Sequence, residues 1–368
     1  MKSIALFLMC TQFLVAQKKH FHAIEYNLSF LQKHSPRMNF DPEGLSHGIE
    51  YRFFKQSSGC KHWENYYNAP RIGFLAKFLY LGNPNQILGN AFSIYPFLEM
   101  DFGKRFHLLL SDGIAYFDSP FHIKKNPKQN AIGSHWNRSI CIKGQWRIYR
   151  NRYFDFFSGI GFTHYSNGAY DSPNLGLNYP SLDFHLRQKS VELNPFVKNK
   201  NAARIYSKWS TSLRTGLALK ELKTTGGPKF FVYTLSVDAG YHYSDYKAIQ
   251  FGAESEYHAV SPYFYEHTSA VENLNPFQLA LRHQLFVAHE WLLGKTSVSL
   301  SAGYRLNKDI LLGGYSFYNK LNVSYHFPRL FRVVEPILGI SLKANFGVAD
   351  HMALYFGLRW HKLKSSSN

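Results

Sequence analysis

Apolar and polar residues alternate with a period of two along much of this 368-residue chain. Residues i and i+2 share one face of a β-strand, so the alternation predicts strands with one apolar and one polar face. Small and charged residues occupy the second face, as expected for strands that separate lipid from a polar barrel interior. The clearest segments are 208–217, 231–242, 277–282, 297–305 and 317–326.

The N-terminus indicates export. Lys2 precedes an apolar run from Ile4 to Val15, and Ala16 follows as a small residue suited to cleavage. This is the order of a secretory signal peptide, and the run is shorter than the roughly 20 residues of a transmembrane helix. We therefore expect residues 1–16 to be a signal peptide and residues 17–368 to be the mature chain.

The mature chain predicts an all-β fold, one transmembrane antiparallel barrel of the outer membrane with about 16 strands, in a range of about 12 to 16. Bacterial barrels have long outer loops and short periplasmic turns, and the predicted connections alternate in the same way. Residues 56–69 form a long connection where a short turn is expected. The other long connections are 32–45, 118–133, 167–180 and 261–275, and the short ones lie near Gly103, Asn151, Ser244 and Gly294.

Composition agrees with a membrane barrel. Aromatic residues make up 17% of the chain, with 25 Tyr and 32 Phe, although the mean hydropathy of −0.28 would suit a soluble β-sandwich equally well. The net charge of +18 favours an anionic partner. Export argues against nucleic acid, so a membrane surface rich in lipid phosphates is the better match. Cys60 and Cys141 remain after processing, and their pairing is left open.

One segment, residues 162–178, carries candidate chemistry. His164 and Ser166 share the parity of Phe154, Phe156, Ile160 and Phe162, which places both on the lipid-facing side of a strand. Residues i and i+2 lie about 7 Å apart on that face, so an imidazole nitrogen can approach the hydroxyl. A serine needs such an adjacent base to become a nucleophile. The His-x-Ser pattern is common by chance, however, and a histidine at a barrel rim is usually interfacial.

The longer pattern is more specific. The run His164-Tyr-Ser166-Asn167, followed by Pro173-Asn-Leu-Gly176, resembles the signature of PagL-type lipid A deacylases, also called acyloxyacyl hydrolases. Three upstream pieces resemble the longer, Bacteroidetes-like members of that family, so that the resemblance covers roughly residues 20–190. These pieces are His34-Ser35-Pro36, Leu88-Gly89 and Asn130-Ala-Ile-Gly133-Ser134.

The resemblance implies an activity and the residues that perform it. Ser166 would be the nucleophile and His164 the base, and Asn167 with Gly168 would bind the oxyanion. The substrate would be lipid A, the membrane anchor of lipopolysaccharide, and the ester a 3-O-linked one. The family's third catalytic residue is a Glu, whereas Asn178 stands at the matching position here. Asp171 in the loop is the nearest substitute, because strand parity directs Asp183 into the lumen.

Other candidate residues are weaker. Lys124, Lys125 and Lys128 lie in an expected outer loop and could hold lipid phosphates, although a solvated loop is an equal alternative. No metal-ligand spacing or phosphate-binding loop is present, so we expect no metal and no cofactor. The sequence thus predicts an outer-membrane esterase acting on lipid A. The alternative is a non-catalytic porin or structural barrel that retains the motif, and the oligomeric state is left open.

Overall fold

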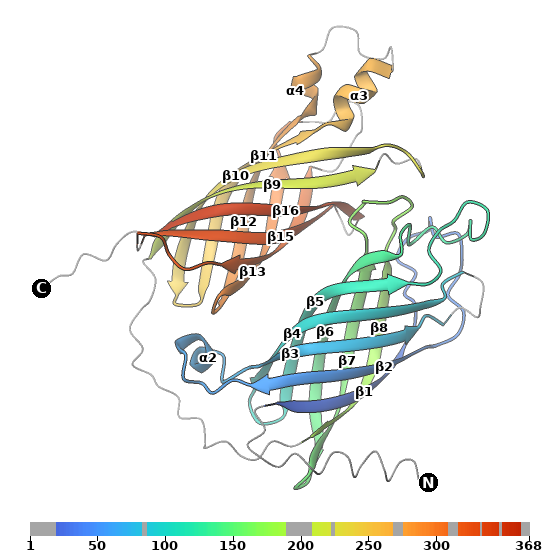
Figure 1. Ribbon diagram of the computed structural model, residues 1–368, viewed down its shortest axis with the longest axis vertical. Helices are drawn as coiled ribbons and strands as arrows, with labels where there is room; N and C mark the ends of the chain where they lie inside the picture. The colour runs from blue at the N-terminus through green and yellow to red at the C-terminus, as the bar shows by residue number, and fades with distance from the viewer. Residues whose placement is uncertain are drawn as a thin grey trace, which may run out of the picture.

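The computed structural model describes residues 20–82, 87–188, 208–221, 225–267, 275–307, 316–331, 333–345 and 348–361, so the expected signal peptide lies outside the described residues. The strands form two closed antiparallel barrels, which follow one another along the chain (Figure 1). The first barrel contains β1 to β8 and the second contains β9 to β16.

The strands of the first barrel are β1 (Phe21–Ser29), β2 (Ser46–Gln56), β3 (Arg71–Tyr80), β4 (Asn90–Phe102), β5 (Phe106–Phe117), β6 (Trp136–Arg150), β7 (Phe154–Ser166) and β8 (Leu177–Gln188). Those of the second are β9 (Trp209–Glu221), β10 (Lys229–Ser244), β11 (Lys247–His258), β12 (Leu281–Leu293), β13 (Thr296–Arg305), β14 (Phe317–His326), β15 (Val334–Asn345) and β16 (Val348–His361). The short helices are α2 (His62–Tyr66), α3 (Val260–His267) and α4 (Pro276–Ala280).

The expectation of a single barrel over residues 17–368 needs correction, because the strands close twice. β8 pairs with β1, with Ser29 opposite Ser181, and β16 pairs with β9, with His361 opposite Ser210. The alternation of residues along a strand decides which face is apolar, but it carries no information about which edge a strand pairs with. The strand number was therefore expected from sequence, whereas the point of closure was not.

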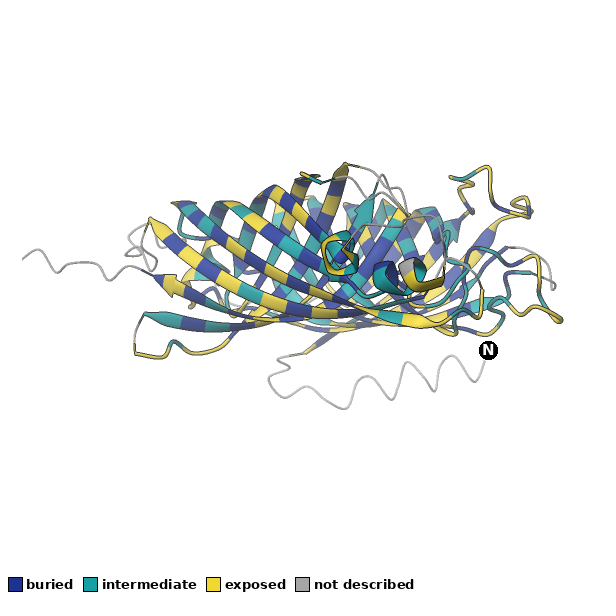
Figure 2. Cartoon of the chain, turned by 90° about the horizontal axis from the view of Figure 1, so that it is seen from above, coloured by how far each residue is buried: buried dark blue, intermediate teal, exposed yellow. Residues whose placement is uncertain are grey.

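The assignment of faces is confirmed. Buried and exposed residues alternate along the strands of both barrels, which gives the chequered pattern of Figure 2. The polar face points inward and the apolar face outward. Leu213, Leu235, Ile160 and Leu182 are each between 44% and 67% exposed on the outside, whereas Asp183 is fully buried inside. Apolar surface on this scale is typical of a face that contacts lipid.

The interior of the first barrel is filled with an ionic network. Glu50 accepts hydrogen bonds from Arg52 Nε and from Lys143 Nζ, each at 2.6 Å, and Glu25 lies beside the same two cations. These four side chains are fully buried. Barrels with eight strands have interiors just wide enough for side chains to fill. The polar lumen expected from sequence is therefore packed with charged side chains.

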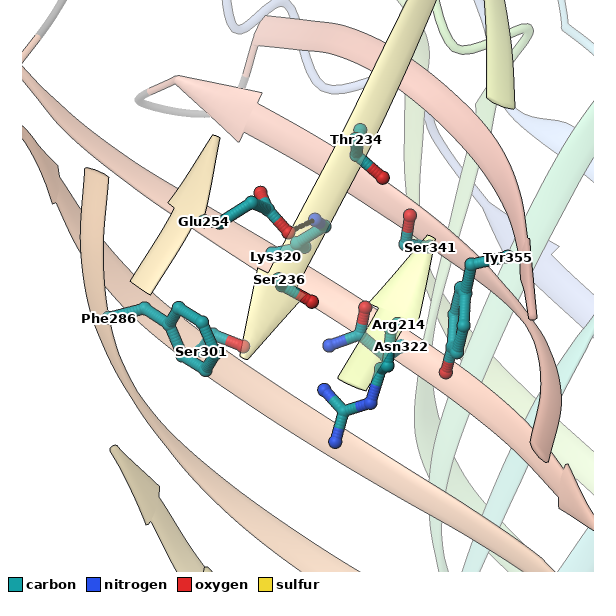
Figure 3. A pocket seen from close by; sticks show the side chains of 10 residues that line it. All are labelled: Arg214, Thr234, Ser236, Glu254, Phe286, Ser301, Lys320, Asn322, Ser341 and Tyr355. Atoms are coloured by element: carbon teal, nitrogen blue, oxygen red, sulfur yellow. Dashed lines mark hydrogen bonds and ion pairs between the residues drawn. The ribbon is translucent and has the colours of Figure 1, made fainter. Parts of the chain in front are cut away.

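The second barrel is filled in a similar way (Figure 3). Lys320 donates to Glu254 at 2.6 Å, and Arg214 and Tyr355 line the same small cavity of about 20 Å³. A second ion pair joins Lys343 to Glu256 at 2.8 Å. Strands β9 to β16 thus build their own packed interior instead of widening the first barrel.

The two ends of the barrels differ as the sequence indicated. The long connections after β1, β5, β7 and β11 lie at one end, which we call the loop end, and the short connections after β4, β6, β10 and β12 lie at the other, the turn end. Ser166 is the last residue of β7 and lies at the loop end. The long connection at residues 56–69, unexplained by the sequence, contains α2 and lies at the turn end.

This connection reaches the second barrel. Tyr67 donates its hydroxyl hydrogen to the Tyr246 carbonyl oxygen at 3.3 Å, and Ser244 Oγ donates to the Tyr66 hydroxyl at 3.2 Å. The indole of Trp63 lies against Gly294, in the turn between β12 and β13. Residues 56–69 therefore contact the second barrel at the turn end.

One predicted strand segment is wrong. Residues 277–280 alternate in polarity but form α4, and strand pairing by β12 starts at Leu281. Asn275 caps this helix by accepting from the Phe277 N–H at 2.9 Å, and Pro276 occupies its first turn, where the missing N–H costs nothing. Of the helices in the described segments, none has the length and hydrophobicity needed to cross a membrane.

Candidate active site

Two neighbouring strands place the candidate residues side by side. In the register of β7 and β8, His164 lies opposite Asn178, and in that of β6 and β7, Ser166 lies opposite Arg138. His164 and Ser166 have the outward parity of Phe162 in β7. Their side chains therefore lie on the outer wall of the first barrel at its loop end, as the alternation predicted.

His164 is held by the residue at the third position. Its Nδ1 is 2.6 Å from Asn178 Oδ1, so Nδ1 carries the proton and donates it to the amide oxygen. This fixes the tautomer in which Nε2 has a free lone pair and is able to act as a base. Gly176 makes room for the imidazole, because a Cβ at this residue would lie 3.0 Å from His164 Cε1.

Ser166 is only 3% exposed and contacts two hydrogen-bond donors. Asn174 Nδ2 donates to Ser166 Oγ at 3.0 Å, and the backbone N–H of Gly168 donates to the same oxygen at 3.2 Å. Ser166 Oγ and the His164 ring, both among the described residues, form no direct hydrogen bond with each other. Catalytic hydrogen bonds are often long or misaligned in an enzyme without substrate. Catalysis with His164 as the base would require Ser166 Oγ to leave Asn174 and approach the ring.

The hydrogen-bond donors of Asn167, a predicted oxyanion residue, are paired within the loop. Its side-chain amide donates to Ser134 Oγ at 3.1 Å and to the Asp171 carbonyl oxygen at 2.8 Å. Its backbone N–H donates to Asn174 Oδ1 at 3.1 Å. Asn167 therefore holds the loop together, and the amide that touches Ser166 belongs to Asn174.

Asp171, the candidate substitute for the missing acid, pairs with the second barrel. Its carboxylate lies 2.6 Å from Lys229 Nζ, which also sits 3.8 Å from the centre of the Tyr170 ring. The side chain of Glu221 accepts from the Ser172 N–H, and the backbone N–H of Glu221 donates to the Ala169 carbonyl oxygen at 3.1 Å. The loop between β7 and β8 is thus bound to the ends of β9 and β10.

An apolar cluster closes the loop end of the first barrel beneath the site. Tyr165 and Leu177, the neighbours of the candidate catalytic residues, are completely buried in it. Other members come from the loops, among them Leu31, Met38, Phe40, Leu88 and Ile132. Buried apolar packing of this kind is rigid, so the cluster fixes the strand ends that carry His164 and Ser166.

The three upstream sequence pieces meet at this loop. His34 Nε2 lies 3.0 Å from the Leu175 carbonyl oxygen, and Leu88 belongs to the apolar cluster. A Cβ on Gly133 would lie 2.7 Å from the Pro173 carbonyl oxygen, so glycine permits the close approach of two loops. Residues that are far apart in sequence are therefore brought together around one segment, 167–176.

The remaining candidates lie apart from the catalytic pair. Lys124, Lys125 and Lys128 are exposed in the connection between β5 and β6. Cys60 is exposed and Cys141 is buried inside the first barrel, and both are free thiols, which settles a pairing that the sequence left open.

Two clusters of carboxylate and histidine side chains inside the barrels have ligand atoms close together, and no spacing in the sequence indicated them. One is Glu99, Asp101 and His107, and the other is Glu256, Asp350 and His351. Arg71 contacts Glu99 at 2.8 Å and Lys343 contacts Glu256 at 2.8 Å. Lysine and arginine thus already balance the charge of these carboxylates.

Sequence reasoning missed four residues at the site. Asn174 was part of the quoted motif but was given no role, and Arg138, Glu221 and Lys229 were not considered. The register could have found Arg138, because it lies opposite Ser166 on the outer face of β6. Glu221 and Lys229 belong to the second barrel, and no local pattern in the sequence indicates that they reach the loop.

Comparison with known proteins gives two family matches. The model described as Lipid A 3-O-deacylase (PagL) matches residues 39–187, and the model described as Acyloxyacyl hydrolase, C-terminal domain, matches residues 207–362. Each match falls within one of the two barrels. No curated protein matches the chain.

Among solved structures, the outer membrane protein opdK from Pseudomonas aeruginosa is 8% identical, with a TM-score of 0.24, over 93% of this chain and 98% of that one. A mutant of the Rh. blastica porin is 10% identical, with a TM-score of 0.19, over 93% and 99% of the two chains.

Proposed function

Because this chain belongs to the family of PagL-type lipid A deacylases, we propose that it is an outer-membrane esterase that removes a 3-O-linked acyl chain from lipid A. The observation that carries the mechanism is the hydrogen bond of 2.6 Å between His164 Nδ1 and Asn178 Oδ1. It orients the imidazole on the outer wall, two residues from a serine whose Oγ already meets two hydrogen-bond donors.

The reaction proceeds through an acyl-enzyme. Ser166 Oγ attacks the ester carbonyl carbon, and His164 Nε2 takes the hydroxyl proton. The carbonyl oxygen becomes negative and receives hydrogen bonds from the Gly168 N–H and from Asn174 Nδ2, while Asn167 keeps the loop in shape. His164 returns the proton to the leaving alkoxide. A water molecule, deprotonated by His164, then releases the fatty acid and regenerates Ser166.

The position of the site suits a lipid substrate. The outer wall around His164 is apolar, with Phe162 39% exposed and Ile160 67% exposed. In an outer membrane this wall lies against acyl chains, and the loop end lies at the level of the head groups. The ester that joins a chain to its head group would therefore meet Ser166 without leaving the bilayer. The excess of basic residues suits the phosphates of lipopolysaccharide.

The packed interiors weigh against the alternative of a porin. A porin needs an aqueous lumen, which requires more strands than eight. Here charged and polar side chains fill both barrels. Conductance in planar bilayers separates the two functions. We expect no stable open steps, and steps of porin size would support the alternative.

Mass spectrometry of lipid A, from cells with and without the gene, tests the activity and identifies the ester. We expect lipid A that lacks one acyl chain only where the gene is present. The protein itself should require detergent for extraction and show heat-modifiable mobility in gels. Unchanged lipid A, together with folded protein in the membrane, would contradict the proposed function.

A further inference from the structure

We infer that the second barrel forms one wall of the pocket that holds the acyl chain of the substrate, an inference that rests on the proposed function. A cavity of about 420 Å³ lies between the outer faces of the two barrels. Asn167 and Gly168 of the candidate active site line it, and Leu219, Ile340 and Met352 of the second barrel line it as well. Its size falls within the roughly 300–1,000 Å³ of ordinary ligand pockets.

The lining residues of the second barrel come from its outward face. Leu219 has the outward parity of Leu217 in β9, and Met352 has that of Leu354 in β16. Ile340 of β15 is 45% exposed. On a lone barrel these side chains would face lipid. Here they face residues 167–176 of the first barrel, which we call the site loop. An apolar chain that enters the cavity would therefore contact both barrels.

The contact between site loop and second barrel is close. Gly168 has a φ of +66°, and a Cβ at this position would lie 2.7 Å from Met352 Cβ. Gly168 also supplies the N–H that meets Ser166 Oγ. Met352 therefore touches the residue that we assign to oxyanion binding, and a chain beside Met352 would end at the reacting ester.

The cavity also contains an ion pair on the otherwise apolar outer face of the first barrel. Arg138 and Asp112 project from the outer wall of the first barrel, and Arg138 donates to Asp112 from Nε at 2.8 Å and from Nη2 at 2.5 Å. Arg138 is only 8% exposed, and its Nη1 has no hydrogen-bond partner among the described residues. A buried donor without a partner is costly. An oxygen at the ester end of the substrate would satisfy it, since Arg138 lies opposite Ser166.

An acyl chain is the occupant that fits these features together. The three residues from the second barrel are apolar, so they would contact a hydrocarbon chain without leaving a polar group unpaired. The polar groups gather on the side of Ser166, where the ester oxygens would lie. The length of chain that the enzyme accepts should therefore depend on Leu219, Ile340 and Met352, which belong to the barrel without the catalytic pair.

Binding of a fluorophore-labelled dodecanoic acid to the full-length protein in detergent tests this inference without relying on catalysis. Met352→Trp fills the cavity and should weaken binding by about tenfold or more. Leu354→Trp is the matched control, because Leu354 lies on the same strand and face but does not line the cavity. Leu219→Trp and Leu217→Trp repeat the comparison on β9. Heat-modifiable mobility shows which variants are folded.

Hydrolysis supplies the second measurement. On esters of increasing acyl length, Met352→Trp should move the preference towards shorter chains and raise KM more than it lowers kcat. Equal binding by folded Met352→Trp, Leu219→Trp and wild type would overturn the inference even if lipid A is hydrolysed. Conversely, fatty-acid binding that Met352→Trp and Leu219→Trp weaken, in a protein that hydrolyses no ester, would uphold the pocket and refute the proposed function.

Discussion

The two barrels have the same strand number and similar polar interiors, but their loop ends differ. In the first barrel a large apolar cluster, which includes Leu88, Ile132 and Tyr165, packs beneath the loop of the candidate active site. The buried apolar clusters of the second barrel, within its described residues, are small: Ala218, Val232 and Ala353 form one, and Phe286, Ala288 and Tyr318 the other. A precise site needs rigid support, and among the described residues the larger buried apolar cluster lies in the first barrel.

The corresponding strands differ in chemistry as well. β7, the seventh strand of the first barrel, ends with His164 and Ser166 on its outer face. β15, the seventh of the second, carries Leu342 and Ala344 on its outer face near the same end. In the proposed function the first barrel holds the reactive groups, and the second presents apolar side chains beside them. The proposed division of work between the barrels can be tested by substitutions in each of them.

The largest effect is expected from Ser166→Ala, which removes the nucleophile. Release of fatty acid from lipid A should fall by about 10⁴-fold or more, because loss of one member of a nucleophile–base pair disables the whole unit. Ser158→Ala is the matched control, since Ser158 lies on the same face of β7 towards the turn end. If folded Ser166→Ala retained wild-type turnover, the chemistry would lie elsewhere.

A smaller loss is expected from Gly168→Ala. A residue with a side chain is strained at a φ of +66°, and its Cβ would press on Met352. We expect turnover to fall by about 100-fold, since small misplacements of catalytic groups have effects of this size. Adding Met352→Gly should restore part of the loss, because it removes the Cβ that the new side chain would contact. Without any rescue, the damage would come from strain in the loop alone, and the two barrels would be uncoupled here.

The sequence predicted the faces of the strands well, because the side-chain period of two is a local property. It also predicted which connections are long, since strand ends are marked by loss of alternation. The sequence did not predict which strands pair to close each barrel. Pairing of β8 with β1 joins residues such as Ser29 and Ser181, which no local pattern connects. The helix over Pro276–Ala280 was missed because its cap and proline outweighed a polarity pattern only a few residues long.

For the site, the sequence located the pair that shares a strand. His164, Ser166 and Asn178 were placed together because parity and a motif sufficed. The resemblance implied an oxyanion role for Asn167, and it gave no role to Asn174, whose amide reaches the Ser166 hydroxyl because of the way the loop turns. The contacts of Asp171 with Lys229 depend on the packing of two barrels, and sequence spacing does not encode that packing.

Asn178→Glu should sharpen the assignment of the third catalytic position. During attack His164 becomes positive, and a carboxylate within reach stabilises that charge where an amide does not. Turnover should rise about tenfold, well below the roughly 10⁴-fold known for acid-to-amide exchange in another fold. Asn178→Gln controls for the longer side chain. The gain is limited because an ionised Glu beside lipid loses hydration. Fatty-acid release is the measurement, and a large loss in Asn178→Glu would show that the position tolerates no charge.

The smallest effect is expected from Asp171→Ala. Its carboxylate is directed to Lys229 of the second barrel, whereas Asn178 occupies His164 Nδ1. The ion pair is partly exposed, with 25% and 32% of the two side chains accessible, and such pairs contribute little. Turnover should therefore fall by only about threefold, and Lys229→Met should have the same effect because it breaks the same contact.

The double variant of Asp171→Ala with Lys229→Met decides between a positioning role and a catalytic one. If Asp171 only positions the loop, the two substitutions are not additive, and the double variant is no worse than either single one. Lys295→Met, in the turn between β12 and β13, is the control for loss of a positive charge. If Asp171→Ala is instead inactive while Lys229→Met is not, and Asn178→Glu brings no gain, the acid of the site is Asp171. Lys229 of the second barrel would then bind the catalytic carboxylate of Asp171 in the absence of substrate. The second barrel would in that case influence the reaction itself as well as acyl-chain binding.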